Sequence, residues 1–228
     1  MKVLVWFRND LRLHDHFPLH KALKAGAEVI PVYCFDPRQF GQTAFGFPKT
    51  GKFRAQFLIA SVADLRRSLQ QRGSNLIIRT GLPEDVLPAL ANEVQADAIY
   101  WHEEVTAEEL VVERAIATRI KAAGRQVQTY WGATLYHPDD LPFAVAKLPQ
   151  VFTQFRKQVE QSSIVREALP PPTQLSPVPT ALNPGTLPTL ESLGSDAPGP
   201  DHRAVLAFNG GETAGLARLQ DYIWEADC

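Results

Sequence analysis

Short apolar runs alternate with amphipathic segments over the first 131 residues of the chain. The runs are continuous, which indicates strands that are buried on both faces of a parallel sheet. The segments between them carry apolar residues at the spacing of an amphipathic helix. This pattern predicts an α/β fold with a Rossmann-like five-stranded parallel sheet and helices on both faces. The predicted strands are residues 2–7, 28–35, 75–80, 97–102 and 126–131.

Two of the predicted helices carry clear boundary signals. The first lies between the second and third strands and ends near Gly73. The second follows "TAEE" at 106–109, a capping box in which Thr106 accepts from the Glu109 amide and the Glu109 carboxylate reaches back; Gly124 closes it. The apolar stripe of the first helix is expected to pack on the sheet and consists of Phe53, Phe57, Leu58, Val62, Leu65 and Leu69.

The pattern changes after residue 131. "QVFTQFRKQVE" predicts a helix, and a last helix is expected over 212–224, after a Gly-Gly turn. Between them, residues 170–200 hold nine of the eighteen prolines, a composition typical of a linker that buries little and wraps over a surface. We expect an α/β domain over 1–135, a connecting helical segment over 136–168, a Pro-rich linker over 169–208, and a last segment over 209–228, so that the chain reads as the first part of something longer.

Composition and charge exclude few classes of protein. The formal net charge of -2 provides no basic field of the kind that a self-sufficient DNA-binding protein uses. No window approaches the ~18 apolar residues that a membrane span needs, so we expect no membrane contact. Cys34 lies in an apolar run and Cys228 is the last residue, so a disulfide between them is not expected. These features fit a cytoplasmic protein.

The first predicted strand ends in Arg8-Asn9-Asp10-Leu11-Arg12, where a dinucleotide-binding unit would have a glycine-rich turn. The segments 8–15, 36–49 and 103–105 are expected at the carboxyl edge of the sheet, where open α/β sheets bind ligands. Arg8, Asp10 and Arg12 place fixed charges there. We interpret them as a structural clamp that ties these loops to one another and to a second domain.

Catalytic and metal-binding motifs are not found in the sequence. His14, His16 and His20 are joined by no third ligand at a zinc spacing, so no metal site is predicted. No G-x-S-x-G motif or other signature of an activated nucleophile occurs, and no catalytic residue is predicted.

Six stretches closely resemble the DNA photolyase and cryptochrome family, and within it the cryptochrome DASH branch. They span residues 3–224 in the order of the family, and the "FPKTG" loop and the "GGETAGLARL" stretch are typical of that branch. The stretches are "VLVWFRNDLRLHDH", "VYCFDPRQFG", "FGFPKTGKFRAQFLIASVADLRRSL", "YWGATLYHPDDLPF", "FTQFRKQVE" and "FNGGETAGLARLQDYIW".

The resemblance implies a two-part blue-light flavoprotein. Its first part is a light-harvesting domain that holds an antenna chromophore, and its second is a helical domain that holds FAD and accepts the DNA lesion. The full-length family is linked to light-driven repair of pyrimidine dimers or to photoreception. The family's "YKETRNG"-like stretch does not occur in this chain. The resemblance makes residues 209–228 the first helix of this helical domain, whose remainder is missing. We therefore expect FAD and DNA to bind only through the missing domain, supplied in cis or in trans, and this chain alone to be inactive as a lyase.

The resemblance also implies an antenna site. Glu104 matches the family's antenna-binding glutamate, and Phe45 and Phe47 match the aromatic loop that lies against the chromophore, for which 5,10-methenyltetrahydrofolate is the expected ligand. One carboxylate can accept from the amino group and the ring N–H of a pterin together. An alternative stays open: a stand-alone Rossmann-like module that binds a nucleotide or a protein and has no photochemistry.

Overall fold

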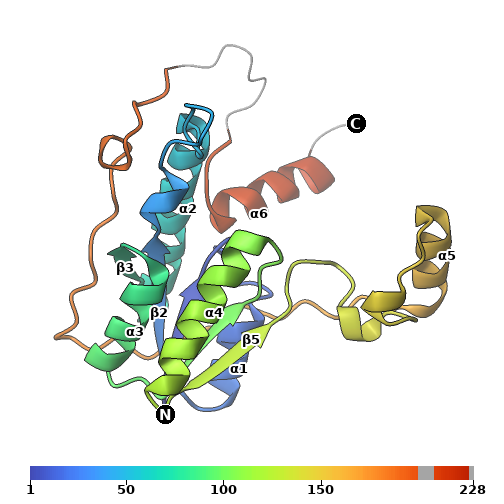
Figure 1. Cartoon of the computed structure of the whole chain (residues 1–228), viewed down its shortest axis with the longest axis horizontal. Helices are drawn as coiled ribbons and strands as arrows, with labels where there is room; N and C mark the ends of the chain where they lie inside the picture. The colour runs from blue at the N-terminus through green and yellow to red at the C-terminus, as the bar shows by residue number, and fades with distance from the viewer. Residues whose placement is uncertain (200–207, 226–228) are drawn as a thin grey trace.

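The protein is described by a computed structural model that covers residues 1–199 and 208–225. Five parallel strands form one sheet in the order β3-β2-β1-β4-β5 (Figure 1). Each begins and ends within two residues of its predicted bounds, so the predicted Rossmann-like fold is confirmed. The strands are β1 (Lys2–Phe7), β2 (Glu28–Phe35), β3 (Ile77–Thr80), β4 (Ala98–His102) and β5 (Gln126–Tyr130).

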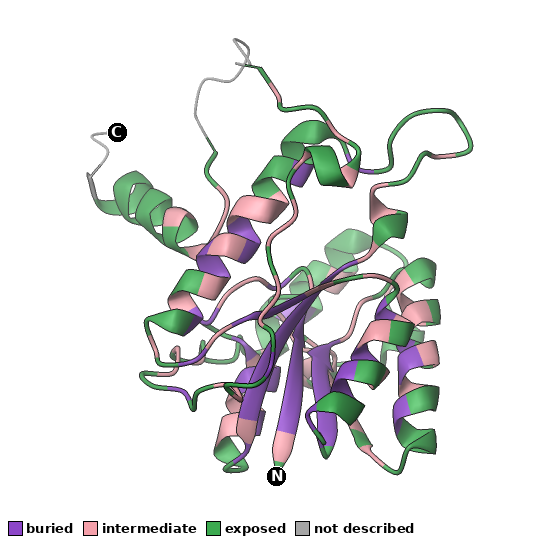
Figure 2. Cartoon of the chain, turned by 90° about the vertical axis from the view of Figure 1, so that its left-hand side faces the viewer, coloured by how far each residue is buried: buried purple, intermediate pink, exposed green. Residues whose placement is uncertain are grey.

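Helices cover both faces of the sheet, as predicted. Because successive side chains of a strand point to opposite faces, Val5 and Leu4 of β1 belong to two different hydrophobic clusters. The cluster of Val5 contains residues of α1 (Phe17–Lys24) and α2 (Lys52–Gln70), and that of Leu4 contains residues of α3 (Pro83–Glu93) and α4 (Ala107–Ala122). β1, β2 and β4 are mostly buried between these helix pairs (Figure 2), whereas β5 at the edge of the sheet is partly exposed.

Two local predictions were wrong. The stripe of α2 does not pack on the core at its start: Phe53 and Phe57 are 45% and 48% exposed, and Phe57 lines a cavity beyond the strand ends. From Leu58 onward the stripe contacts the core. The capping box is also absent. Thr106 is the N-cap residue of α4, but its side chain makes no capping hydrogen bond, and Glu109 lines the same cavity instead of reaching back.

The Pro-rich segment packs more closely on the domain than its composition predicts. Leu175 and Leu182 are only 5% and 6% exposed, and each enters the core on a different face of the sheet. The Ile78 amide of β3 donates to the Pro184 carbonyl over 2.8 Å. We call residues 169–187 the strap, because this segment runs along α2 and the β3 edge (Figure 1). The expectation that it buries little was wrong, because two leucines fill places in the core that composition alone does not reveal.

The last described helix, α6 (Glu212–Gln220), is held to the domain at its first turn and continues as a π-helical turn, Asp221–Glu225. The Glu212 carboxylate accepts from the amides of Leu13 and His14, and Asp64 of α2 accepts from the Thr213 amide over 3.0 Å. Residues 200–207 of the expected linker, and Cys228, lie outside the described residues. The part of the chain that the structure describes holds no helix long and apolar enough to cross a membrane.

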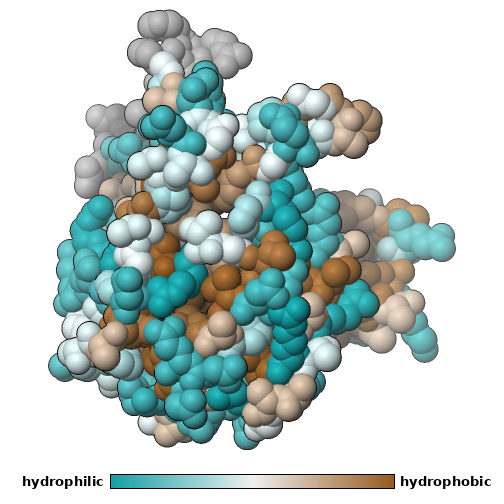
Figure 3. Space-filling model, turned by 60° about the vertical axis from the view of Figure 1, so that its left-hand side comes forward, coloured by the Kyte–Doolittle hydropathy of each residue, from teal (hydrophilic) through white to brown (hydrophobic). Residues whose placement is uncertain are grey.

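Apolar surface is left uncovered at several places. The helix α5 (Phe152–Ser162) projects from the body of the domain (Figure 1), and exposed apolar side chains occur on it and on α6. On the face drawn in Figure 3, hydrophobic side chains also gather between hydrophilic ones.

The remaining helical elements are short 3-10 turns at Pro37–Gln39, Pro138–Asp140, Val145–Lys147 and Glu191–Leu193.

Candidate functional site

The loops after β1, β2 and β4 lie at the edge of the sheet where these parallel strands end. β1 is the central strand, and the chain builds the sheet outward from it first on one side and then on the other. Such a change of direction opens a crevice at the carboxyl ends of the strands, which is where open α/β sheets bind ligands. The fold therefore places the three loops predicted as a binding region at this crevice.

A cavity of about 660 Å³ occupies this edge. Its walls come from the ends of β1 and β2 and from the first turns of α2 and α4. A volume of this size suits a small flat ligand, and aromatic walls with a few polar groups are typical of such sites. Its lining includes Trp6, Asn9, Phe40, Phe57 and Leu58.

Basic side chains form part of the cavity wall. The guanidinium carbon of Arg8 lies 4.4 Å from the centre of the Trp6 ring, a cation–π contact. Lys49 pairs with Glu108, which joins the loop before α2 to the first turn of α4. Within residues 1–199 and 208–225, Arg54 has no carboxylate partner. In this part of the chain the wall thus holds one basic side chain without an ion pair, Arg54, and one acidic side chain without an ion pair, Glu109.

The thiol in the cavity wall is not an activated nucleophile. Burial raises the pKa of Cys34 to about 12, because the charged thiolate loses its hydration. Its Sγ donates to the Gly81 carbonyl over 3.4 Å. At neutral pH the group therefore stays a neutral thiol, which suits a wall that binds a ligand and does not attack it.

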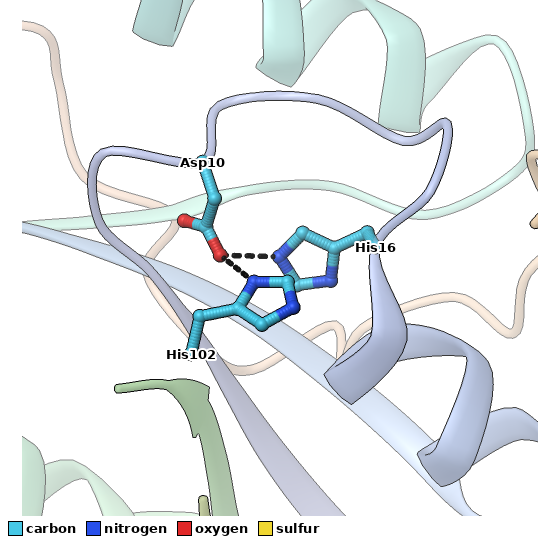
Figure 4. Close-up of side chains that lie close together, drawn as sticks. All are labelled: Asp10, His16 and His102. Carbon is cyan, nitrogen blue, oxygen red and sulfur yellow. Dashed lines mark hydrogen bonds and ion pairs between the residues drawn. The ribbon is translucent and has the colours of Figure 1, made fainter. Parts of the chain in front are cut away.

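Asp10, His16 and His102 form a buried cluster beside this edge (Figure 4). The Asp10 carboxylate lies 2.6 Å from Nδ1 of His102 and 2.9 Å from Nε2 of His16, and it accepts from the Arg8 amide over 2.7 Å. Burial by itself raises the pKa of the Asp10 carboxyl, but the two histidines outweigh it and hold the pKa well below its usual range. The cluster thus contains a permanently charged carboxylate.

The protonation of His16 determines whether the cluster suits a metal ion. Burial lowers the pKa of His16, so its ring is neutral. Its Nδ1 accepts from the Leu19 amide over 3.2 Å at the N-terminus of α1. The proton of the neutral ring is therefore on Nε2. Nε2 faces Asp10, but its direction is too poorly aligned with the carboxylate for a hydrogen bond. A protonated Nε2 has no lone pair for a metal ion. The arrangement suits a hydrogen-bonded cluster, and the absence of a metal site stays a prediction.

Glu104 lies at the rim of the edge, between β4 and α4. Its carboxylate accepts from Nδ2 of Asn9 over 2.6 Å, and its backbone amide donates to Glu113 of α4 over 2.9 Å. Arg8 pairs with the same Glu113 carboxylate. Arg8, Asn9 and Glu104 are thereby joined in one network, although Glu104 itself does not line the cavity.

Phe45 and Phe47 lie apart from this network. Their rings stack on each other at 6.1 Å, and they are 85% and 56% exposed. A tight loop displays them, in which the amide and hydroxyl of Thr43 donate to the Phe47 carbonyl. Among the described residues, the guanidinium of Arg12 donates only to carbonyl groups of its own loop. The structure therefore joins Arg8 and Asp10 to neighbouring elements but does not gather Glu104, Phe45 and Phe47 into one cluster.

Two residues of the site were missed in the sequence. His102 is the last residue of β4, and Glu113 is a buried carboxylate in the second turn of α4. The available signal for His102 was its position at the end of a predicted strand, at the edge where open α/β sheets bind ligands. Glu113 gave no signal, because charged residues on surface helices are common.

Comparison with known proteins identifies relatives of this chain. The family model "DNA photolyase" matches residues 3–176. Cryptochrome DASH of Gloeobacter violaceus is 56% identical over 223 residues, which are 98% of this chain and 44% of that protein. Blue-light photoreceptor PHR2 of Arabidopsis thaliana is 46% identical over 228 residues, which are 99% of this chain and 50% of that protein. The chain thus spans about half the length of these relatives.

Solved structures give the same result. The crystal structure of a Synechocystis cryptochrome superposes with a TM-score of 0.93 at 53% identity, covering 98% of this chain and 46% of that one. An archaeal photolyase from Sulfolobus tokodaii, with two FAD molecules, superposes with a TM-score of 0.75 at 26% identity, covering 96% of this chain and 46% of that one. The parallel sheet, the family model and the high identity to cryptochrome DASH proteins lead to one conclusion: this chain belongs to the DNA photolyase family.

Proposed function

We propose that this chain is the light-harvesting part of a cryptochrome DASH or photolyase-type flavoprotein, and that it binds a flat conjugated antenna chromophore at the carboxyl edge of its sheet. The observation that carries the proposal is the cavity at this edge, with its aromatic walls and with Arg54, which forms no ion pair within the described residues. An antenna transfers its excitation through space, so the protein must hold it in a fixed position but needs no acid, base or nucleophile.

The walls suit such a ligand. Trp6, Phe40 and Phe57 offer apolar faces and edges for a planar ring system, and Arg54 can meet a negative group of the ligand. The solved structure of the Sulfolobus tokodaii photolyase is described as containing two FAD molecules, with the implication of a novel light-harvesting cofactor. That similarity supports a chromophore here, and it makes FAD a ligand worth testing.

A folate-type antenna is the more specific proposal. Glu104 would accept from the pterin amino group and ring N–H, and Phe45 and Phe47 would cover the ring from the neighbouring loop. Both phenylalanines are exposed, which leaves their faces free for a ligand or for a second domain. Arg8, Asp10 and Arg12 would act as a clamp that holds the loops in place.

The functions of the whole protein are also proposed. The chain spans about half the length of its relatives, so FAD and DNA would bind through a helical domain outside this chain. Repair of pyrimidine dimers or photoreception would then belong to the two parts together. The competing function is a nucleotide- or protein-binding module without photochemistry.

Titration of the purified chain with 5,10-methenyltetrahydrofolate and with FAD, followed by absorption and by Trp fluorescence, tests the proposal. We expect saturable binding of at least one chromophore. Arg54→Ala should weaken binding at least about fivefold if the ligand occupies the cavity, and Glu104→Ala should do so if a pterin sits on the rim. Arg67→Ala, on the same helix but outside the cavity, is the matched control. Binding of a colourless nucleotide with neither chromophore would favour the competing function.

A further inference from the structure

Glu113 is buried in α4, and nothing in the sequence suggested a role for it. Only 7% of the residue is exposed, whereas most charged residues of this helix are exposed. A carboxylate at such a position is costly unless it is paired and hydrogen-bonded. Its partners therefore indicate why it is there.

A single oxygen of Glu113 accepts from two different elements. Oε1 receives the backbone amide of Glu104 over 2.9 Å and the guanidinium of Arg8. The first contact comes from the loop between β4 and α4, and the second from the end of β1. Glu113 thus joins α4 to two of the three loops at the carboxyl edge.

Both partners continue into the proposed site. Arg8 lies over the Trp6 ring on the cavity wall, and Glu104 holds Asn9, which also lines the cavity. Arg8 and Asn9 are neighbours in the chain, so Glu113, Glu104, Asn9 and Arg8 form a closed ring of contacts. Movement of the Glu113 carboxylate would change both the wall of the cavity and its rim.

We propose that Glu113 is a positioning residue of the chromophore site: it orients Arg8 against Trp6 and fixes the backbone of Glu104, so that cavity and rim act as one site. The inference rests on the proposed function for its ligand, but its geometry is a property of the free chain. Glu113 itself does not line the cavity, and it acts through its two partners.

The test uses Glu113→Gln, which keeps the oxygen but removes its charge, and Glu113→Ala, which removes both contacts. Asp64→Asn is the matched control, because Asp64 is a buried carboxylate on a helix that pairs with an arginine and lies outside the cavity. The free chain is measured first. The Trp6 contribution to fluorescence, isolated by comparison with a Trp6→Phe background, should change in both Glu113 variants and not in Asp64→Asn.

Chromophore binding is measured second, with 5,10-methenyltetrahydrofolate and FAD. We expect about tenfold weaker binding and a shifted absorption maximum for Glu113→Ala, and a smaller loss for Glu113→Gln. Adding Arg8→Gln to Glu113→Ala should weaken binding by less than Arg8→Gln does alone, because both changes disturb one contact.

The two proposals fail separately. If the natural chain binds neither chromophore but the Trp6 signal responds to Glu113, the proposed function fails and the positioning role stands. If the Trp6 signal and the affinity of both Glu113 variants match those of Asp64→Asn, the positioning role is wrong, whatever the chromophore.

Discussion

Nδ1 of His102 lies 2.6 Å from the carboxylate of Asp10, and this buried contact joins the end of β4 to the loop after β1. His16 approaches the same carboxylate from the start of α1. The loop after β1 and the start of α1 therefore meet the end of β4, which is 92 residues away from Asp10, on one negative charge. The stability of this edge should depend on whether that charge is present.

Acid is expected to destabilise the domain through this cluster. The pKa of His16 is lowered from 6.5, so below that pH the unfolded chain binds a proton that the folded chain does not. Asp10 acts in the same direction below 3.8, where only the unfolded carboxyl takes up a proton. The free energy of unfolding, measured in urea at several pH values, should therefore fall as the pH decreases from 6.5.

The His16→Asn variant separates the histidine from the other titrating groups. Asparagine is a good N-cap residue, so α1 keeps a capping group. The variant is expected to be less stable at neutral pH, because the ring of His16 packs 4.3 Å from that of Phe7. Between about pH 7 and about pH 5, however, its free energy of unfolding should fall less than that of the natural chain, by on the order of 1 kcal/mol. Equal slopes would show that His16 titrates normally.

Gly185→Ala should detach the strap from β3. Gly185 has φ +72°, and a Cβ added there would lie 2.1 Å from the Ile78 carbonyl oxygen. We expect a loss of about 2 kcal/mol or more in unfolding free energy, and faster proteolysis within 169–187. Gly194→Ala is the control, since Gly194 has φ +74° and, among the described residues, no atom within 4 Å of such a Cβ; it should lose only about 1 kcal/mol. Similar losses at both sites would contradict the steric argument.

Cys34 should resist thiol reagents in the folded chain. With a pKa of about 12, roughly one thiol in 10,000 is ionised at about pH 8. A Cys228→Ser background leaves Cys34 as the one cysteine of the chain. We expect negligible labelling by iodoacetamide over an hour, and stoichiometric labelling in urea. Rapid labelling of the folded chain would mean that the cavity wall opens.

Thr106→Ala should cost little stability, because the Thr106 hydroxyl caps nothing. A working N-cap contributes about 1 kcal/mol, and we expect a loss below about 0.5 kcal/mol here. Thr50→Ala is the comparison: the Thr50 hydroxyl donates to the Gln39 carbonyl over 2.6 Å and is nearly buried, so its loss should reach about 1 kcal/mol. A larger loss of unfolding free energy in urea for Thr106→Ala than for Thr50→Ala would show that the Thr106 hydroxyl does cap α4.

Most of the fold was predictable because continuous apolar runs have few alternatives to strands of a covered parallel sheet. The errors arose where one residue type serves two purposes. Phe57 has the spacing of a core residue but lines a cavity, and a local capping rule cannot show that Glu109 points elsewhere. Composition predicted the strap as a whole but could not identify Leu175 and Leu182 as core residues.

The site was less predictable for a physical reason. Asp10 follows β1 and His102 ends β4, and they meet because these two strands pair in the sheet. The order of the strands in the sheet is not visible in the sequence. The role of Glu113 depends on the direction of one buried carboxylate. Sequence patterns report periodicity and local boundaries, but not which polar groups of distant segments share a hydrogen bond.

The strap also determines how large the sheet can become. An outermost strand with free amides can recruit a strand from another molecule, which is a route to aggregation. At β3 the Ile78 amide already donates to the carbonyl of Pro184. Proline has no N–H, so Pro184 cannot donate a hydrogen bond to a further strand. The proline-rich segment therefore blocks the addition of a further strand at β3. It should reduce edge-to-edge association of the protein at high concentration.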